Sequence, residues 1–178
     1  MAPSNTVAPI HVGFLTILHE PSGYLGGYLV TNTWGRPLEF RLSTAVQPNR
    51  VQQILYGGTL EPYICADLIG KTLVDKTGIG IQLVVTDCPM ALDLRLRMEV
   101  PVIWLAPGRE TPAGLGPPLI SASAARGAVF IHARHPHDGP LVRELLDRLD
   151  GTLDLAEPFV RIRDAIGEAR KMGVTKSA

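Results

Sequence analysis

The densest group of chemically active side chains lies at residues 132–138, with the sequence His-Ala-Arg-His-Pro-His-Asp, and it holds three of the five histidines. Imidazole and carboxylate are the groups with which proteins bind zinc and similar transition metals. Residues two apart on a strand share a face, so we expect His135 and His137 to be ligands, completed by Asp87 from a neighbouring strand end. Asp138 is expected to orient the ligands or to cap the next helix. The alternative is a solvated polar loop.

A second group of reactive side chains follows residues 81–86, an apolar run with the composition of a buried strand. Asp87 comes directly after this run, where α/β proteins commonly place functional carboxylates. Cys88 is expected near the N-terminus of a helix, where the helix dipole lowers the pKa of a thiol. Asp87 and Cys88 are therefore candidate catalytic residues. The alternative is a capping role for Asp87 and a core position for Cys88.

A third group of residues has the composition of a partner-binding surface. Trp34 and Arg36 share an expected turn, and a tryptophan beside an arginine is frequent in binding hot spots. Arg41 lies on the expected exposed face of a strand at residues 38–44, and Arg134 lies within the histidine segment. We expect these four side chains to bind a partner. The alternative for Trp34 is that it covers one edge of the core.

The elements that must position these residues change character along the chain. Apolar and β-branched segments, separated by turns with glycine and proline, predict an antiparallel three-stranded meander at the N-terminus. Helices and short strands then alternate, and two helices end the chain, so the predicted fold class is α/β with a mixed sheet. Strands are expected at residues 10–18, 24–31, 38–44, 81–86, 100–105 and 128–132, and helices at 48–56, 60–74, 89–98, 141–149 and from 154 onward.

This order of elements is similar to that of a ribonuclease-H-like fold, in which three antiparallel strands precede alternating helices and parallel strands. A nuclease of that kind would carry an acidic residue inside its first strand to bind Mg²⁺, because two-metal catalysis needs several carboxylates around both ions. Residues 10–18 contain no acidic residue, and Glu20 lies beyond the end of this strand. The resemblance therefore implies a degenerate, non-catalytic version of the fold.

The length of 178 residues suits one domain. We place this domain at residues 10–150, with a short arm at 1–9 before it and a C-terminal helix and tail at 151–178. Two cysteines are too few for a disulfide framework, and no apolar run reaches the length of a membrane span. These features predict a cytoplasmic protein that does not contact membranes.

The chain has 17 basic and 17 acidic residues, so its formal net charge is zero. A neutral chain has no overall attraction to phosphate backbones, which counts against nucleic acid as a partner. We therefore expect a protein partner or a homo-oligomer, and the favoured function is a non-catalytic interaction or accessory subunit. The first alternative is a small metal-dependent hydrolase or nuclease that uses Asp87, residues 132–138 and a divalent metal. The second is a nucleic-acid-binding module.

Overall fold

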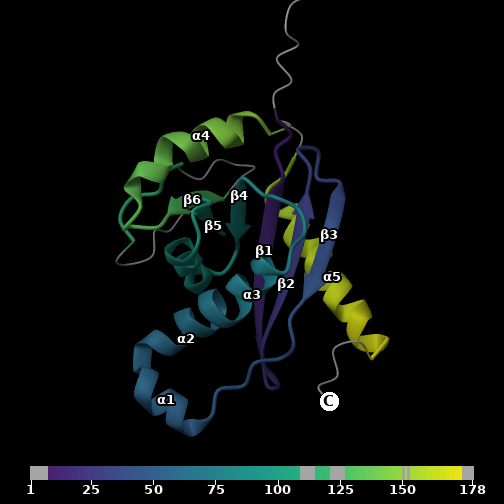
Figure 1. Ribbon diagram of the computed structural model, residues 1–178, viewed down its shortest axis with the longest axis vertical. Helices are drawn as coiled ribbons and strands as arrows, with labels where there is room; N and C mark the ends of the chain where they lie inside the picture. The colour runs from purple at the N-terminus through teal and green to yellow at the C-terminus, as the bar shows by residue number, and fades with distance from the viewer. Residues whose placement is uncertain (1–7, 109–114, 121–126, 150, 152, 174–178) are drawn as a thin grey trace, which may run out of the picture.

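A six-stranded mixed sheet with helices on both faces forms the centre of the molecule (Figure 1). The computed structural model describes residues 8–108, 115–120, 127–149, 151 and 153–173. The strand order is β3-β2-β1-β4-β5-β6, which confirms the predicted α/β class and the ribonuclease-H-like order of the elements. The strands are β1 (Val12–Glu20), β2 (Gly23–Thr31), β3 (Pro37–Leu42), β4 (Leu83–Thr86), β5 (Val102–Ala106) and β6 (Ala128–Ile131).

The first three strands form the expected antiparallel meander. A tight turn joins β1 to β2, with Glu20 paired to Gly23. Gly23 has a φ of 114°, a conformation that side chains disfavour, which explains the glycine at this position. All nine residues of β2 are buried because helices cover both faces of the sheet there, whereas β3 lies at the edge and stays largely exposed.

The centre of the sheet is parallel. Strand β4 pairs with β1 and with β5 in parallel, and β6 returns antiparallel to β5. The connection from β4 to β5 passes through the 3-10 helix η3 (Pro89–Arg97). This arrangement confirms the strand–helix–strand unit expected from the two buried apolar runs.

A nearly continuous helical segment covers one face of the sheet. It consists of α1 (Arg50–Tyr56), the 3-10 helix η1 (Gly57–Thr59), α2 (Leu60–Pro62), the π-helix η2 (Tyr63–Gly70) and α3 (Lys71–Asp75). Gly57 has a φ of 53°, so the segment changes direction at the expected position. Helix α1 extends away from the sheet and buries none of its residues (Figure 1).

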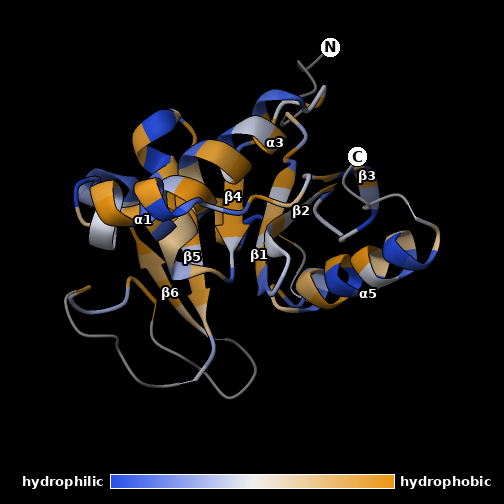
Figure 2. Ribbon diagram, turned by 90° about the horizontal axis from the view of Figure 1, so that it is seen from below, coloured by the Kyte–Doolittle hydropathy of each residue, from blue (hydrophilic) through white to orange (hydrophobic). Residues whose placement is uncertain are grey.

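The opposite face is covered by α4 (Gly139–Asp147), preceded by the 3-10 helix η4 (Pro136–Asp138), and by α5 (Glu157–Lys171). Alternation along the strands divides the core into two layers: Phe14 packs toward α5 and Leu15 toward η2. Figure 2 shows hydrophobic residues along the central strands and an alternation of hydrophobic and hydrophilic residues along α5. No helix in the described part of the chain is long and apolar enough to cross a membrane.

The starts of the last two helices differ from expectation. Asp138 stands at the N-cap of α4, but its side chain makes no capping hydrogen bond. Asp154 and Glu157 have the spacing of a capping box, but none forms, because the N-cap of α5 is Ala156, whose amide donates to Asp154. Glu157 and Arg161, four residues apart on α5, form an ion pair at 2.9 Å. Residues 107–118, which are rich in glycine and proline, lie partly outside the described residues.

Candidate functional site

The two groups of reactive side chains lie at opposite edges of the sheet. Asp87 follows the carboxyl end of β4. Because β6 is antiparallel to β5, the chain leaves β6 at the edge where β5 begins, and residues 132–138 lie there. The structure therefore does not bring Asp87 to His135 and His137. The composition of a short strand shows that it is buried but not its direction, so the sequence could not exclude this pairing.

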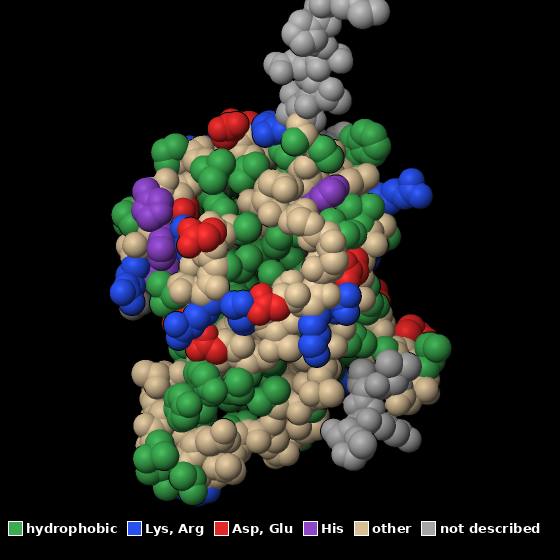
Figure 3. Space-filling model, in the orientation of Figure 1, with side chains coloured by type: hydrophobic (Ala, Val, Ile, Leu, Met, Phe, Trp, Pro, Cys, Tyr) green, Lys and Arg blue, Asp and Glu red, His purple; other side chains and the backbone are tan. Residues whose placement is uncertain are grey.

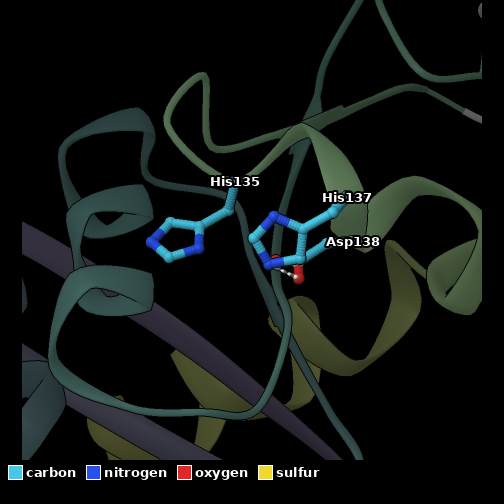
Figure 4. A group of neighbouring side chains, drawn as sticks. All are labelled: His135, His137 and Asp138. Carbon is cyan, nitrogen blue, oxygen red and sulfur yellow. Dashed lines mark ion pairs between the residues drawn. The ribbon is translucent and has the colours of Figure 1, made fainter.

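The histidine segment contains one converging set of ligand atoms. His135, His137 and Asp138 each offer one nitrogen or oxygen atom, and these atoms all lie within 4.8 Å of one another (Figure 4). The ring centroids of the two histidines are 5.2 Å apart, and Nε2 of His137 is 3.6 Å from Oδ1 of Asp138. Asp138, expected only to cap or to orient, therefore supplies the carboxylate of this set. Among the described residues, this is the one set of this kind.

Asp138 is buried and bound to an arginine that the sequence interpretation did not single out. Nε of Arg95 donates to Oδ2 of Asp138 at 2.7 Å, and Nη2 donates to Oδ1 at 3.2 Å. A further nitrogen of the same guanidinium donates to the carbonyl of Met98 at 2.7 Å. Arg95 and Asp138 are 6% and 4% exposed. The pair fixes the carboxylate rigidly, as the groups around a metal ligand commonly do. Its only sequence signal is an arginine between two leucines, Leu94 and Leu96.

His132 is also buried and uses both ring nitrogens. Nδ1 accepts a hydrogen bond from the amide of Arg134, and Nε2 lies 3.1 Å from Oδ1 of Asp93. Since Nδ1 is an acceptor, the proton of the neutral ring sits on Nε2 and is donated to Asp93. His132 is thereby held in place beside His135, at a ring-centroid distance of 5.9 Å, and is occupied by other partners. Arg134 itself is exposed.

His135 is arranged to remain neutral. Desolvation, followed by the positive charge of Arg95, lowers the pKa of His135 from its ordinary value of 6.5. Its Nδ1 is buried and has no hydrogen-bond partner among the described residues. A metal competes with protons for imidazole nitrogens, so a neutral ring with an unpartnered nitrogen is well suited to coordination.

The edge that carries Asp87 has a different chemistry. One oxygen of Asp87 accepts a hydrogen bond from Arg163 of α5. Its other oxygen and the hydroxyl of Thr16 are both buried without a partner among the described residues. Burial raises the pKa of Asp87, and the nearby Thr16 hydroxyl and then the charge of Arg163 oppose that shift. The N-cap of η3 is Cys88 and not Asp87.

Cys88 lies in contact with the second cysteine. A hydrogen bond from the Cys65 thiol is the largest cause that lowers the pKa of Cys88, and the amides of Met90 and Ala91 act in the same direction. Both thiols are free, and both contact the core layer that faces η2. The expected low pKa of Cys88 therefore has a specific cause beyond the helix terminus.

The donor set at this edge does not fit the two divalent ions that a ribonuclease-H-like nuclease uses. The position level with Asp87 on β1 is Thr16, since Leu15 pairs with Thr86. Of the other acidic residues near the strands, Glu20 is paired with Arg170, and Asp67 is paired with Arg97. Among the described residues, Asp87 is left without a second free carboxylate beside it, whereas two divalent ions need several carboxylates around them.

The expected partner-binding residues lie on exposed parts of the chain. Trp34 is 74% exposed, so it does not cover the core. Arg36 is exposed beside it. Arg41 forms an ion pair with Glu39 on β3.

Comparisons with protein families and with curated proteins are negative, whereas the comparison with solved structures finds a likeness. No family model matches the chain, and no curated protein does. Among solved structures, endonuclease V of Ciona intestinalis, in complex with a 23mer DNA containing an inosine followed by a ribo-adenosine, is similar at a TM-score of 0.41 and 10% identity. The match covers 61% of this chain and 50% of the endonuclease chain, about half of its length.

The expectation that disfavoured nucleic acid as a partner is corrected, since the similar solved structure contains DNA; the likeness itself assigns no partner to this chain. The preference rested on a net charge of zero. Net charge describes the whole chain, whereas contacts with phosphate depend on where basic groups gather. Figure 3 shows histidine side chains and a row of basic and acidic side chains on one face of the molecule.

Proposed function

We propose that this protein is a metal-dependent hydrolase whose metal ligands are His135, His137 and Asp138. The convergence of these three ligand atoms within 4.8 Å carries the proposal. Three protein ligands leave one coordination position open, which is the pattern of catalytic rather than structural zinc sites. A bound zinc ion supplies a water molecule of lowered pKa, which serves as the nucleophile in hydrolysis.

The side chain of His137 must move before the three ligand atoms can coordinate a metal ion. Zinc–nitrogen bonds of about 2.0–2.1 Å place the ligand atoms of a tetrahedral site about 3.3 Å apart. Asp138 is held by Arg95, so it cannot move far. The side chain of His137 is 69% exposed and is free to turn toward the other two. His135 then contributes a neutral ring from a partly buried position.

One neighbour, Arg134, supports an anionic substrate such as a phosphate ester. Arg134 precedes His135 and carries an exposed guanidinium next to the proposed centre. Guanidinium groups recognise phosphate oxygens through paired hydrogen bonds. Arg95 lies closer but is committed to Asp138 and Met98, so it positions the carboxylate and does not contact substrate.

A hydrolysis assay tests this function. The zinc-loaded protein is expected to cleave bis(p-nitrophenyl) phosphate faster than the protein in EDTA. A variant carrying His135→Ala and His137→Ala should lose this activity, whereas Asp87→Asn, at the opposite edge, should retain it. Equal rates with zinc and with EDTA would contradict the proposal. So would activity that survives loss of both histidines but not of the Asp87 charge.

One specific observation favours a second interpretation, which concerns the end of the sheet at Asp87. A nuclease with the ribonuclease-H-like order would carry its metal ions there, and we infer that this end of the sheet is not catalytic in this protein. There, Thr16 stands level with Asp87, and Arg163 neutralises that carboxylate. The expected result is that Mg²⁺ or Mn²⁺ produces no cleavage that depends on Asp87. Cleavage of an oligonucleotide with Mg²⁺ that is lost in Asp87→Asn would overturn this second interpretation.

A further inference from the structure

A cavity of about 320 Å³ opens between α1, η2 and η3, beside the histidine segment. Its size is at the low end of the range of about 300–1,000 Å³ that is usual for small-ligand sites. Two tyrosines, two aspartates and one arginine supply its aromatic and charged lining: Tyr56, Tyr63, Asp67, Asp93 and Arg97.

The aromatic wall is preformed. The rings of Tyr56 and Tyr63 are stacked at a centroid distance of 4.7 Å and an interplanar angle of 22°. Both rings are half-buried, and helix α1 brings Tyr56 to this position although it buries none of its own residues in the core. An aromatic stack that already has a fixed orientation extends readily by one more flat ring.

The polar wall contains two aspartates that differ in how many hydrogen-bond partners they already have. Asp67 is held by Arg97 through two hydrogen bonds. Asp93 uses Oδ1 to accept from His132, and its Oδ2 has no partner among the described residues. This carboxylate can therefore accept N–H donors from a ligand within the cavity. Asp93 also joins the cavity to the histidine segment, because the same side chain contacts both.

We propose that this cavity binds the base of a nucleotide, stacked on the tyrosine pair and hydrogen-bonded to Asp93. Stacking alone accepts any base. A carboxylate selects guanine over adenine, since guanine presents two neighbouring N–H donors on its Watson–Crick edge and adenine presents a single amino group beside an acceptor. The His132–His135 contact then leads from the base site toward the proposed metal centre.

This inference names the substrate class of the proposed hydrolase, and its role as a substrate site rests on that proposed function. Binding of the base does not require a metal. Titration calorimetry in EDTA with GMP, AMP and ribose 5-phosphate therefore tests the cavity separately from hydrolysis. A protein that binds GMP but no zinc would contradict the proposed function and leave the base site standing.

The expected result is binding of GMP about tenfold tighter than AMP, and no measurable binding of ribose 5-phosphate. Replacing Tyr56 with alanine should weaken GMP binding about tenfold, the scale expected for loss of one stacking ring. Tyr56→Phe should preserve it. Leu55→Ala is the matched control, since Leu55 lies on the same helix, is 77% exposed and does not line the cavity.

Three outcomes would overturn the inference. The first is no binding of GMP to the unaltered protein. The second is binding of GMP that Tyr56→Ala leaves unchanged, since the base would then lie elsewhere. The third is equal affinity for GMP and AMP, or equal affinity for GMP and ribose 5-phosphate, because recognition would then not pass through Asp93 or through the base. Circular dichroism of each variant confirms that the fold is retained.

Discussion

Arg95 and Asp138 form a buried, two-hydrogen-bond ion pair that joins η3 to the start of α4 across 43 residues of sequence. The pair fixes one end of the histidine segment on a helix that crosses between two parallel strands. It also explains why Asp138 does not cap α4: its carboxylate is turned inward to the guanidinium. The position of the proposed metal centre therefore depends on a contact that neighbouring residues in the sequence do not reveal.

Removal of one partner of this pair should strongly destabilise the fold. Asp138→Ala leaves the Arg95 guanidinium buried without its counter-charge, so we expect a loss of about 3–5 kcal/mol in the free energy of unfolding. Urea denaturation in EDTA measures this loss without any contribution from metal. Glu168→Ala, which breaks the exposed pair with Lys171, is the control and should change stability by about 1 kcal/mol or less. Similar effects of the two substitutions would contradict the assignment of Arg95 and Asp138 as a buried pair.

Packing of α5 against β2 should be sensitive to a single added methyl group. A Cβ at Gly27 would lie 2.4 Å from Cγ2 of Ile162 and 3.1 Å from Cδ1 of Ile166. Gly27→Ala is therefore expected to cost about 1–3 kcal/mol, because the helix must move or its side chains must leave their rotamers. Thermal unfolding measures the change.

Gly167 provides the matched comparison on the same helix. An added Cβ there meets nothing within 4 Å. Gly167→Ala should stabilise α5 by about 0.5–1 kcal/mol through its higher helix propensity. A Gly27→Ala protein as stable as the unaltered one would show that α5 does not pack on the sheet in this register.

Protonation of His135 should occur at lower pH than in an unfolded chain. Desolvation and the charge of Arg95 lower its pKa below 6.5, so the folded state binds this proton less readily than the unfolded state does. The contribution of this group to stability is therefore complete above pH 6.5 and falls as the pH decreases below that value. NMR titration of the His135 ring, with the same titration in urea as reference, measures the direction. A folded-state midpoint above the urea value would contradict it.

The sequence predicted the elements of the sheet well because burial and turn chemistry are local signals. The apolar runs at residues 81–86 and 100–105 became the neighbouring parallel strands β4 and β5, and the glycine at position 23 marks the first turn. The candidate site was harder to predict, since ligand geometry depends on strand direction. The antiparallel return of β6 separates Asp87 from His137, and the carboxylate beside the histidines is that of Asp138, the next residue in the chain.

Long-range ion pairs could not be predicted from local patterns. Arg163 and Asp87 are separated by 76 residues, and no periodicity indicates that an exposed position of α5 would face the end of β4. The same holds for the cavity at Tyr56 and Tyr63, whose rings stack although η1 and α2 separate them in the chain. Such contacts result from the packing of whole elements.

Zinc binding by the isolated protein tests the central claim most directly. Titration calorimetry of the metal-free protein with ZnCl₂ at pH 7.5 is expected to give one bound ion per chain. His135→Ala and His137→Ala should each reduce the affinity at least tenfold, while His11→Ala, which lies outside the converging set, should leave it unchanged. Stoichiometric binding that is lost with either histidine of the set supports the account. No binding, or binding that survives both substitutions together, would contradict it.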